Sequence, residues 1–80
     1  VLILRMRAVP AIDASALHIF YEILDTCKRA GITLVFSHVN EQPMKMLQKA
    51  GFDKEVGVEN FCPNIDNALL RAKEIVSANK

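Results

Sequence analysis

The sequence predicts an α/β fold in which parallel strands alternate with helices. Residues 1–8 open with a continuous aliphatic run, and residues 32–36 form a second apolar run that contains β-branched residues. Between the two runs, apolar residues recur at three- and four-residue steps, the period of an amphipathic helix. Continuous apolar strands are typical of a parallel sheet covered on both faces. We therefore expect a strand–helix–strand unit with a right-handed crossover.

The first strand is expected over residues 1–8, VLILRMRA. It ends before Pro10, because proline lacks the N–H that a strand donates to its neighbour. Val1 already has the character of a buried strand interior. We therefore interpret the chain as a piece of a domain whose N-terminal strands lie outside it.

The first helix is expected over residues 14–30. The basic residues Lys28 and Arg29 suit the negative end of the helix dipole, and Gly31 can take the left-handed conformation that ends a helix. The apolar stripe of this helix consists of Ala16, Leu17, Phe20, Ile23 or Leu24, and Cys27.

A second helix is expected to follow the strand at residues 32–36. Asn40 is a good N-cap, and Pro43 is tolerated in the first turn because the N–H it lacks would be unpaired there. Met44 and Leu47 would face the core, and Gly51 would end the helix.

The remainder of the chain predicts a loop and a last helix. Residues 53–62 lack periodicity, so we expect a loop with a short extended piece around residues 56–58. Asn64 is expected to cap the last helix, and the polar tail at residues 77–80 to fray or lead onward. The apolar stripe expected for this helix consists of Ile65, Ala68, Leu69, Ala72, Ile75 and Val76.

Two strands and three helices do not close a sheet, because a lone parallel pair leaves both edges unpaired. We therefore expect further strands, supplied by N-terminal residues outside this chain or by a partner.

Composition and charge argue against several classes of function. Ten basic and nine acidic residues give a net charge of +1, and Lys28-Arg29 is the only adjacent basic pair, so no nucleic-acid partner is indicated. No apolar run approaches the roughly 20 residues that cross a bilayer. The two cysteines are isolated, which favours a reducing, cytoplasmic setting.

The residues that could carry catalysis are sparse. His18 and His38 are far apart in the sequence, and neither lies at metal-ligand spacing from a cysteine. Cys27 falls on an apolar helical stripe, and Cys62 precedes a proline without an obvious base nearby. The chain has no glycine-rich phosphate loop. We therefore expect no enzyme activity, no metal site and no cofactor.

The polar step in VPAIDASALHIF, residues 9–20, is the strongest candidate site. Asp13 lies where a strand-to-helix turn meets the first helix, so its carboxylate can accept a backbone N–H and cap that helix. Ser15 would lie in the first turn, where a phosphate would be stabilised by the helix and repelled by Asp13. The turn would end the strands at the edge where partners approach α/β sheets, so Pro10 and Asp13 mark a candidate docking loop.

Taken together, these segments resemble the STAS domain. The likeness rests on the order of a strand, IDASAL, a long helix, GITLVFSHV, QPMKMLQKAGF and FCPNIDNALLRA. It covers essentially all of residues 1–80 and corresponds to the C-terminal two-thirds of one such domain. The family includes anti-sigma factor antagonists and the cytoplasmic C-terminal region of sulfate permease type anion transporters. The resemblance implies a mixed sheet with helices packed against it, completed by earlier strands.

Within the family, the likeness is closer to the bacterial sulfate permease branch. SHVNEQPMKMLQKAGF followed by NFCPNIDNALLRA resembles the permease pattern. Antagonists typically have Asp-Ser-Ser-Gly at the opening step, and the second serine is phosphorylated. Ser15 matches that serine and Asp13 the acidic residue, but Ala14 and Ala16 depart from the motif, which favours a docking surface over a phosphorylation switch.

Three hypotheses for the function follow. The first is a non-catalytic regulatory and interaction domain of a sulfate permease type transporter, at the cytoplasmic side of the inner membrane. Its partners would be the membrane portion of the same protein, a second copy or a cytoplasmic regulator. The second is a soluble anti-sigma factor antagonist switched at Ser15. The third, a small α/β enzyme or nucleotide-binding protein, lacks a set of acid, base and nucleophile on one turn.

Overall fold

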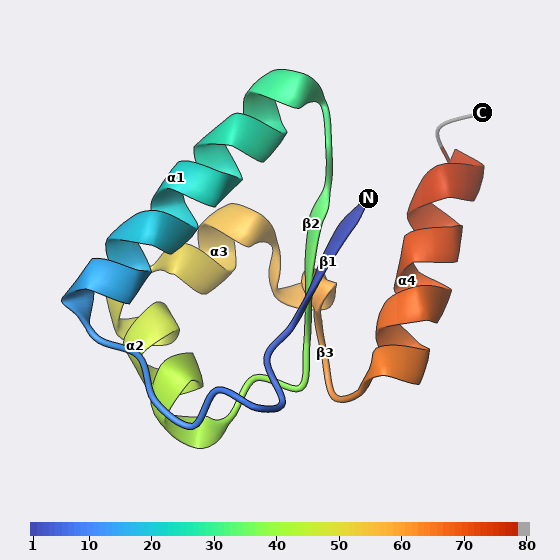
Figure 1. The fold of residues 1–80 in the computed structure, drawn as a ribbon. Helices are drawn as coiled ribbons and strands as arrows, with labels where there is room; N and C mark the ends of the chain where they lie inside the picture. The colour runs from blue at the N-terminus through green and yellow to red at the C-terminus, as the bar shows by residue number, and fades with distance from the viewer. Residues whose placement is uncertain (79–80) are drawn as a thin grey trace.

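A computed structural model describes residues 1–78 and shows a three-stranded parallel sheet between two layers of helices (Figure 1). The sheet order is β1-β2-β3, with α1, α2 and α3 on one side and α4 alone on the other. The elements are β1 (Leu2–Arg5), α1 (Ala14–Ala30), β2 (Leu34–Ser37), α2 (Glu41–Ala50), α3 (Phe52–Val56), a 3-10 turn (Val58–Asn60), β3 (Phe61–Cys62) and α4 (Ile65–Ala78).

The middle strand, β2, is buried along its whole length, as expected for a parallel strand covered on both faces. It pairs with β1 so that Leu4 lies beside Phe36 and Arg5 beside Ser37. Because side chains alternate between faces, Phe36 points into the core under α1, α2 and α3, whereas Ser37 belongs to the α4 face. The residues of the main core are Met6, Ile12, Leu24, Cys27, Leu34, Phe36, Leu47 and Phe52.

Phe36 is the centre of an aromatic cluster that joins four elements. Its ring centroid lies 5.9 Å from that of Phe20 in α1 and 5.8 Å from that of Phe52 in α3, both in edge-to-face geometry. The ring of Phe61 in β3 stacks on it at 4.8 Å. Such pairs add to the stabilisation that area burial alone gives.

The expected helix boundaries are confirmed for α1 and for the end of α2. The first helix begins at Ala14 and ends at Gly31, whose φ of 70° is left-handed and whose N–H donates to the carbonyls of the last turn. Gly51 ends α2 in the same way, with φ 78°. The strands are shorter than expected or shifted, since β1 stops at Arg5 and β2 begins at Leu34.

The prediction of a loop at residues 53–62 is wrong. The chain forms α3 directly after Gly51, because burying Phe52 completely requires the chain to turn back into the core. The strand lies at residues 61–62 and not at residues 56–58, and it pairs with the open edge of β2. Two strand residues are too few to produce a periodic pattern in the sequence.

The buried face of the last helix also differs from the predicted apolar stripe. Asn64 caps it as expected, since its side-chain oxygen accepts the N–H of Asn67 at 2.8 Å. Ala68 is fully buried, but Leu69 and Val76 are exposed, because one helix covers a three-stranded sheet with a narrow face. Ser77 is still helical, and residues 79–80 of the predicted tail lie outside the described residues.

Candidate functional site

The turn before α1 has the capping geometry expected for Asp13. Its backbone is extended, and its carboxylate accepts the N–H of Ala16 at 2.9 Å, while its carbonyl accepts the N–H of Leu17 at 3.0 Å. The carboxylate therefore satisfies one of the first-turn N–H groups, which have no partner within a helix.

Ser15 lies in the first turn of α1, with its side chain exposed to solvent. Pro10 and Asp13 are exposed as well, whereas Ile12 between them is buried in the core. The segment is thus held by one apolar anchor and presents its other side chains outward. The three candidate residues therefore lie on one exposed stretch, with Pro10 and Asp13 in the loop and Ser15 in the first turn of α1.

The backbone of this loop is held by two amide side chains at the start of α2. The Nδ2 group of Asn40 donates to the carbonyl of Val9 at 2.8 Å and to that of Arg7 at 3.1 Å, and it lies 3.4 Å from that of Met6. The Gln42 side chain pairs with Ile12, accepting its N–H at 2.8 Å and donating to its carbonyl at 3.1 Å. We call these two side chains the amide clamp.

The amide clamp was not predicted from the sequence. Asn40 was expected to cap α2, but its side chain makes no capping hydrogen bond and turns to the β1–α1 loop instead. A polar side chain that follows a strand can reach the neighbouring strand end as easily as its own helix, and the local sequence does not distinguish the two. The sequence signal for the clamp was the Gln-Pro pair, in which Gln42 stands directly before Pro43, a residue that is buried.

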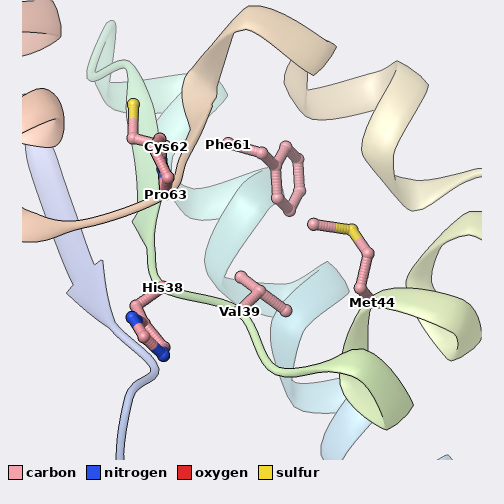
Figure 2. Close-up of a pocket in the computed structure, with 6 residues that line it drawn as sticks. All are labelled: His38, Val39, Met44, Phe61, Cys62 and Pro63. Carbon is pink, nitrogen blue, oxygen red and sulfur yellow. The ribbon is translucent and has the colours of Figure 1, made fainter.

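A hollow of about 370 Å³ opens at the carboxyl ends of β2 and β3 (Figure 2). Val39, Met44 and Phe61 lie toward one another in it, whereas the His38 imidazole and the Cys62 thiol point in different directions (Figure 2). His38 has a left-handed φ of 53°, which turns the chain out of β2. The hollow is therefore lined by both polar and apolar groups, and it holds no nucleophile–base pair between His38 and Cys62.

The electrostatics of Cys62 agree with this description. Burial raises the pKa of the Cys62 thiol; Arg71 acts in the opposite direction, and Glu74 raises it further. A raised pKa lowers the thiolate fraction at neutral pH, so Cys62 has the character of an unactivated thiol.

The other candidate residues also have structural environments. His18 lies 3.1 Å from Glu22 on the exposed face of α1, and Cys27 is buried in the core. Within residues 1–78, no three His, Cys, Asp or Glu side chains come close enough to hold a metal ion. None of the described helices is long and apolar enough to cross a membrane.

Fold and loop together define the class of this molecule. It is a small α/β domain in which parallel strands alternate with helices and an accessible, clamped loop leads into the first long helix. A model of the STAS domain matches residues 1–68. The chain therefore belongs to the STAS domain family, as its resemblance predicted, and the α/β, STAS-like fold class is confirmed.

The fold is also similar to a solved crystal structure, that of a sulfate transporter family protein from Wolinella succinogenes. The TM-score is 0.89 and 39% of the aligned residues are identical. The match covers 94% of this chain and 62% of the solved one, so the chain spans somewhat less than two-thirds of that protein's solved length. A comparison with curated proteins gives no significant match.

Proposed function

We propose that this chain is a non-catalytic regulatory and protein-interaction domain of a sulfate permease type anion transporter. Residues 1–80 would form the C-terminal two-thirds of one STAS domain, at the cytoplasmic side of the inner membrane. Its main partner would be the membrane portion of the same protein, with a second copy or a cytoplasmic regulator as further partners. No cofactor, metal or nucleic acid has a role in this proposal.

The observation that carries the proposal is the similarity to the Wolinella succinogenes sulfate transporter family protein. The identity is 39%, and the match covers 94% of this chain. A function given by fold alone would be an analogy, so the identity and not the TM-score supports the transporter assignment.

The docking surface in this proposal is the exposed loop at residues 10–15. The amide clamp fixes its backbone and Ile12 anchors it, so little conformational entropy would be lost when a partner binds. Ser15 would contribute as a surface residue of this loop. The anti-sigma antagonist alternative is not favoured, because the similar solved structure is a transporter family protein and Ala14 and Ala16 replace the motif residues.

Sulfate uptake and crosslinking test the proposal in the full-length protein that contains this chain. Cells that express it should accumulate labelled sulfate, and a photo-crosslinking side chain at position 15 should attach to membrane-spanning peptides of the same polypeptide. The same group at Asp25, which is exposed farther along α1 and paired with Arg29, is the matched control. Equal crosslinking from both positions would contradict a docking role for the loop, and absence of uptake of any anion would contradict the transporter assignment.

Ser15→Asp tests whether the loop acts as an interaction surface. Ser15 is exposed and the helix N-terminus favours an anion, so we expect the free energy of unfolding to change by less than about 0.5 kcal/mol. Crosslinking and uptake should fall, because a charge enters the contact. A large loss of stability in urea denaturation with uptake intact would assign Ser15 a purely structural role.

A further inference from the structure

A hollow of about 150 Å³ lies between α2, α3 and β3 and combines apolar walls with one carboxylate; we call it the Asp53 hollow. Met44, Val58 and Phe61 supply the apolar walls, and Gln48 and Asp53 supply the polar groups. The volume is well below the roughly 300–1,000 Å³ of sites for drug-sized ligands. The Asp53 hollow therefore suits one side chain or a group of similar size.

The local fold fixes the position of Asp53 in this hollow. Phe52 is completely buried, so the start of α3 is held against the core and the next residue, Asp53, is placed with it. The carbonyl of Asp53 accepts the N–H of Gly57 at 2.9 Å, which ties its backbone to the end of α3. Its carboxylate is the one charged group among the residues that line the hollow.

The Asp53 carboxylate lacks a partner in the described part of the chain. Its Oδ1 atom is buried and has no hydrogen-bond partner, and Asp53 takes part in none of the ion pairs within residues 1–78. A buried carboxylate oxygen without a donor costs free energy, because the water that would solvate it has been removed. The terminal torsion of an aspartate is broad, so a rotation of the carboxylate can present this oxygen to a donor that enters the hollow.

The lining selects a cation that carries an alkyl stem. The Asp53 carboxylate supplies the negative charge, and the exposed amide of Gln48 offers a second acceptor oxygen. The walls of Met44, Val58 and Phe61 offer contact to methylene groups, and Val58 is 62% exposed without an occupant. A lysine side chain has this character, because its stem packs on apolar surface while its compact ammonium group reaches a polar partner.

The surroundings of the Asp53 hollow indicate a lysine that belongs to a longer chain. Met44 and Phe61 also line the larger hollow of about 370 Å³ at the carboxyl ends of β2 and β3, where Val39 lies toward them (Figure 2). A free diamine would leave that apolar surface uncovered. In an extended segment, side chains two residues apart share a face, so a lysine and an apolar residue can enter the two hollows together.

We propose that these two hollows bind an extended segment of a partner protein, in which a lysine ammonium group pairs with Asp53 and an apolar side chain two residues away covers Met44 and Phe61. This site does not rest on the proposed function. None of its lining residues belongs to the docking loop at residues 10–15, and binding can be measured without any transport assay. A failure of one proposal therefore leaves the other intact.

Titration of the 80-residue protein with the peptide acetyl-Leu-Ala-Lys-Ala-Leu-amide tests the site. A leucine lies two residues from the lysine in both directions, so either chain direction satisfies the proposed spacing. Binding is followed by amide chemical shifts at constant ionic strength, and we expect shifts centred on residues 44–48, 53 and 58–61. The same peptide with an acetylated lysine keeps the stem and loses the charge, so it should bind the wild type at least about tenfold more weakly.

Asp53→Asn should weaken binding of the unmodified peptide by about the same factor and remove the preference over the acetylated peptide. Asp66→Asn is the matched control, because it removes the same charge from the exposed first turn of α4 and lines neither hollow. Its affinity should equal that of the wild type.

Three outcomes would overturn the proposal. The first is the absence of saturable shifts with the unmodified peptide, and the second is equal affinity of the wild type for the two peptides. Because both are measured on the wild type, they do not depend on the folding of a variant. The third is an affinity for 1,5-diaminopentane that matches or exceeds that for the peptide, which would assign the Asp53 hollow to a free diamine and not to a protein partner.

Discussion

At the scale of single residues, Tyr21 joins α1 to the junction between α2 and α3. Its hydroxyl donates to the carbonyl of Ala50 at 3.1 Å, and its ring meets that of Phe52 edge-to-face at 5.0 Å between centroids. Burial raises the pKa of Tyr21 above its usual 10.0, and the carboxylate of Glu55 raises it further. Both effects disfavour the phenolate in the folded chain.

Tyr21 is the only tyrosine and the chain has no tryptophan, so its ionisation can be followed directly by ultraviolet absorbance. We expect a midpoint above pH 10 in the folded protein and a return to the usual value in urea. Because the unfolded chain ionises first, this contribution to stability is fully present below pH 10 and is lost as the pH rises through the folded pKa. Tyr21→Phe should lack that alkaline dependence, and an identical midpoint with and without urea would contradict the assignment.

At the scale of elements, the amide clamp connects segments that are more than 30 residues apart in the chain. Asn40 and Gln42 belong to the start of α2, and the carbonyl groups they hold belong to the loop between β1 and α1. Its hydrogen bonds to other backbone groups are few: the N–H of Met6 donates to the carbonyl of Ser37 at 2.8 Å, and the N–H of Val9 donates to the carbonyl of Met6 at 2.9 Å. Its order therefore depends on the clamp and on the burial of Ile12.

Asn40→Asp should destabilise the chain more than Asn40→Ala. The carboxylate has nearly the shape of the amide but no N–H to donate, and it would face the carbonyl oxygens of Met6, Arg7 and Val9. We expect a loss of about 1–3 kcal/mol for the alanine variant and a larger loss for the aspartate variant at neutral pH.

Urea denaturation measures this order of stability, and hydrogen exchange of the amides at residues 7–12 localises the effect. Glu41→Gln changes an exposed neighbour that pairs with Lys45, and it should stay near wild type. An aspartate variant as stable as the alanine variant would mean that the loop is held by Ile12 alone.

The elements that the sequence predicted well are those whose signals are local. Asp13 precedes an amphipathic run and caps it, and glycine ends both α1 and α2. Asn40 was misassigned because its hydrogen-bond partners are supplied by the tertiary fold. The same holds for β3, whose pairing with β2 depends on the path of α3 and not on its own two residues.

At the scale of the whole molecule, α4 forms one layer of the fold alone. Its contact with the sheet is narrow: Ala68 is fully buried, while Leu69 is 55% exposed. Arg71 extends the attachment, since its Nε donates to the buried side chain of Asn60 at 2.8 Å. Asn60 in turn donates to the carbonyl of Val56, so α4 is linked to α3 through one amide.

Two neighbouring substitutions test this narrow contact. Ala68→Leu should lower the free energy of unfolding by about 1–3 kcal/mol, because there is no space for the larger side chain against the sheet. Leu69→Ala should change it by less than about 0.5 kcal/mol, because Leu69 is largely exposed. Thermal unfolding by circular dichroism measures both changes in stability. If Leu69→Ala were the more destabilising substitution, the predicted apolar stripe, in which Leu69 faces the sheet, would be correct.

The sequence predicted the candidate site only in part, because some of its residues are neighbours only in the folded structure. The loop with Pro10, Asp13 and Ser15 is a contiguous stretch, so a local pattern can indicate it. The amide clamp joins the start of α2 to the loop between β1 and α1, and its residues become neighbours only through the tertiary fold. No single segment carries that information.

Within the described residues, the two outer edges of the sheet differ in what they offer to a further strand. The edge formed by β3 has two residues and is followed at once by Pro63, so it offers few groups to an incoming strand. The outer edge of β1 has four residues, and Leu2 there is 40% exposed. A further strand would therefore pair with β1 and not with β3, at the edge away from the stacked rings of Phe36 and Phe61.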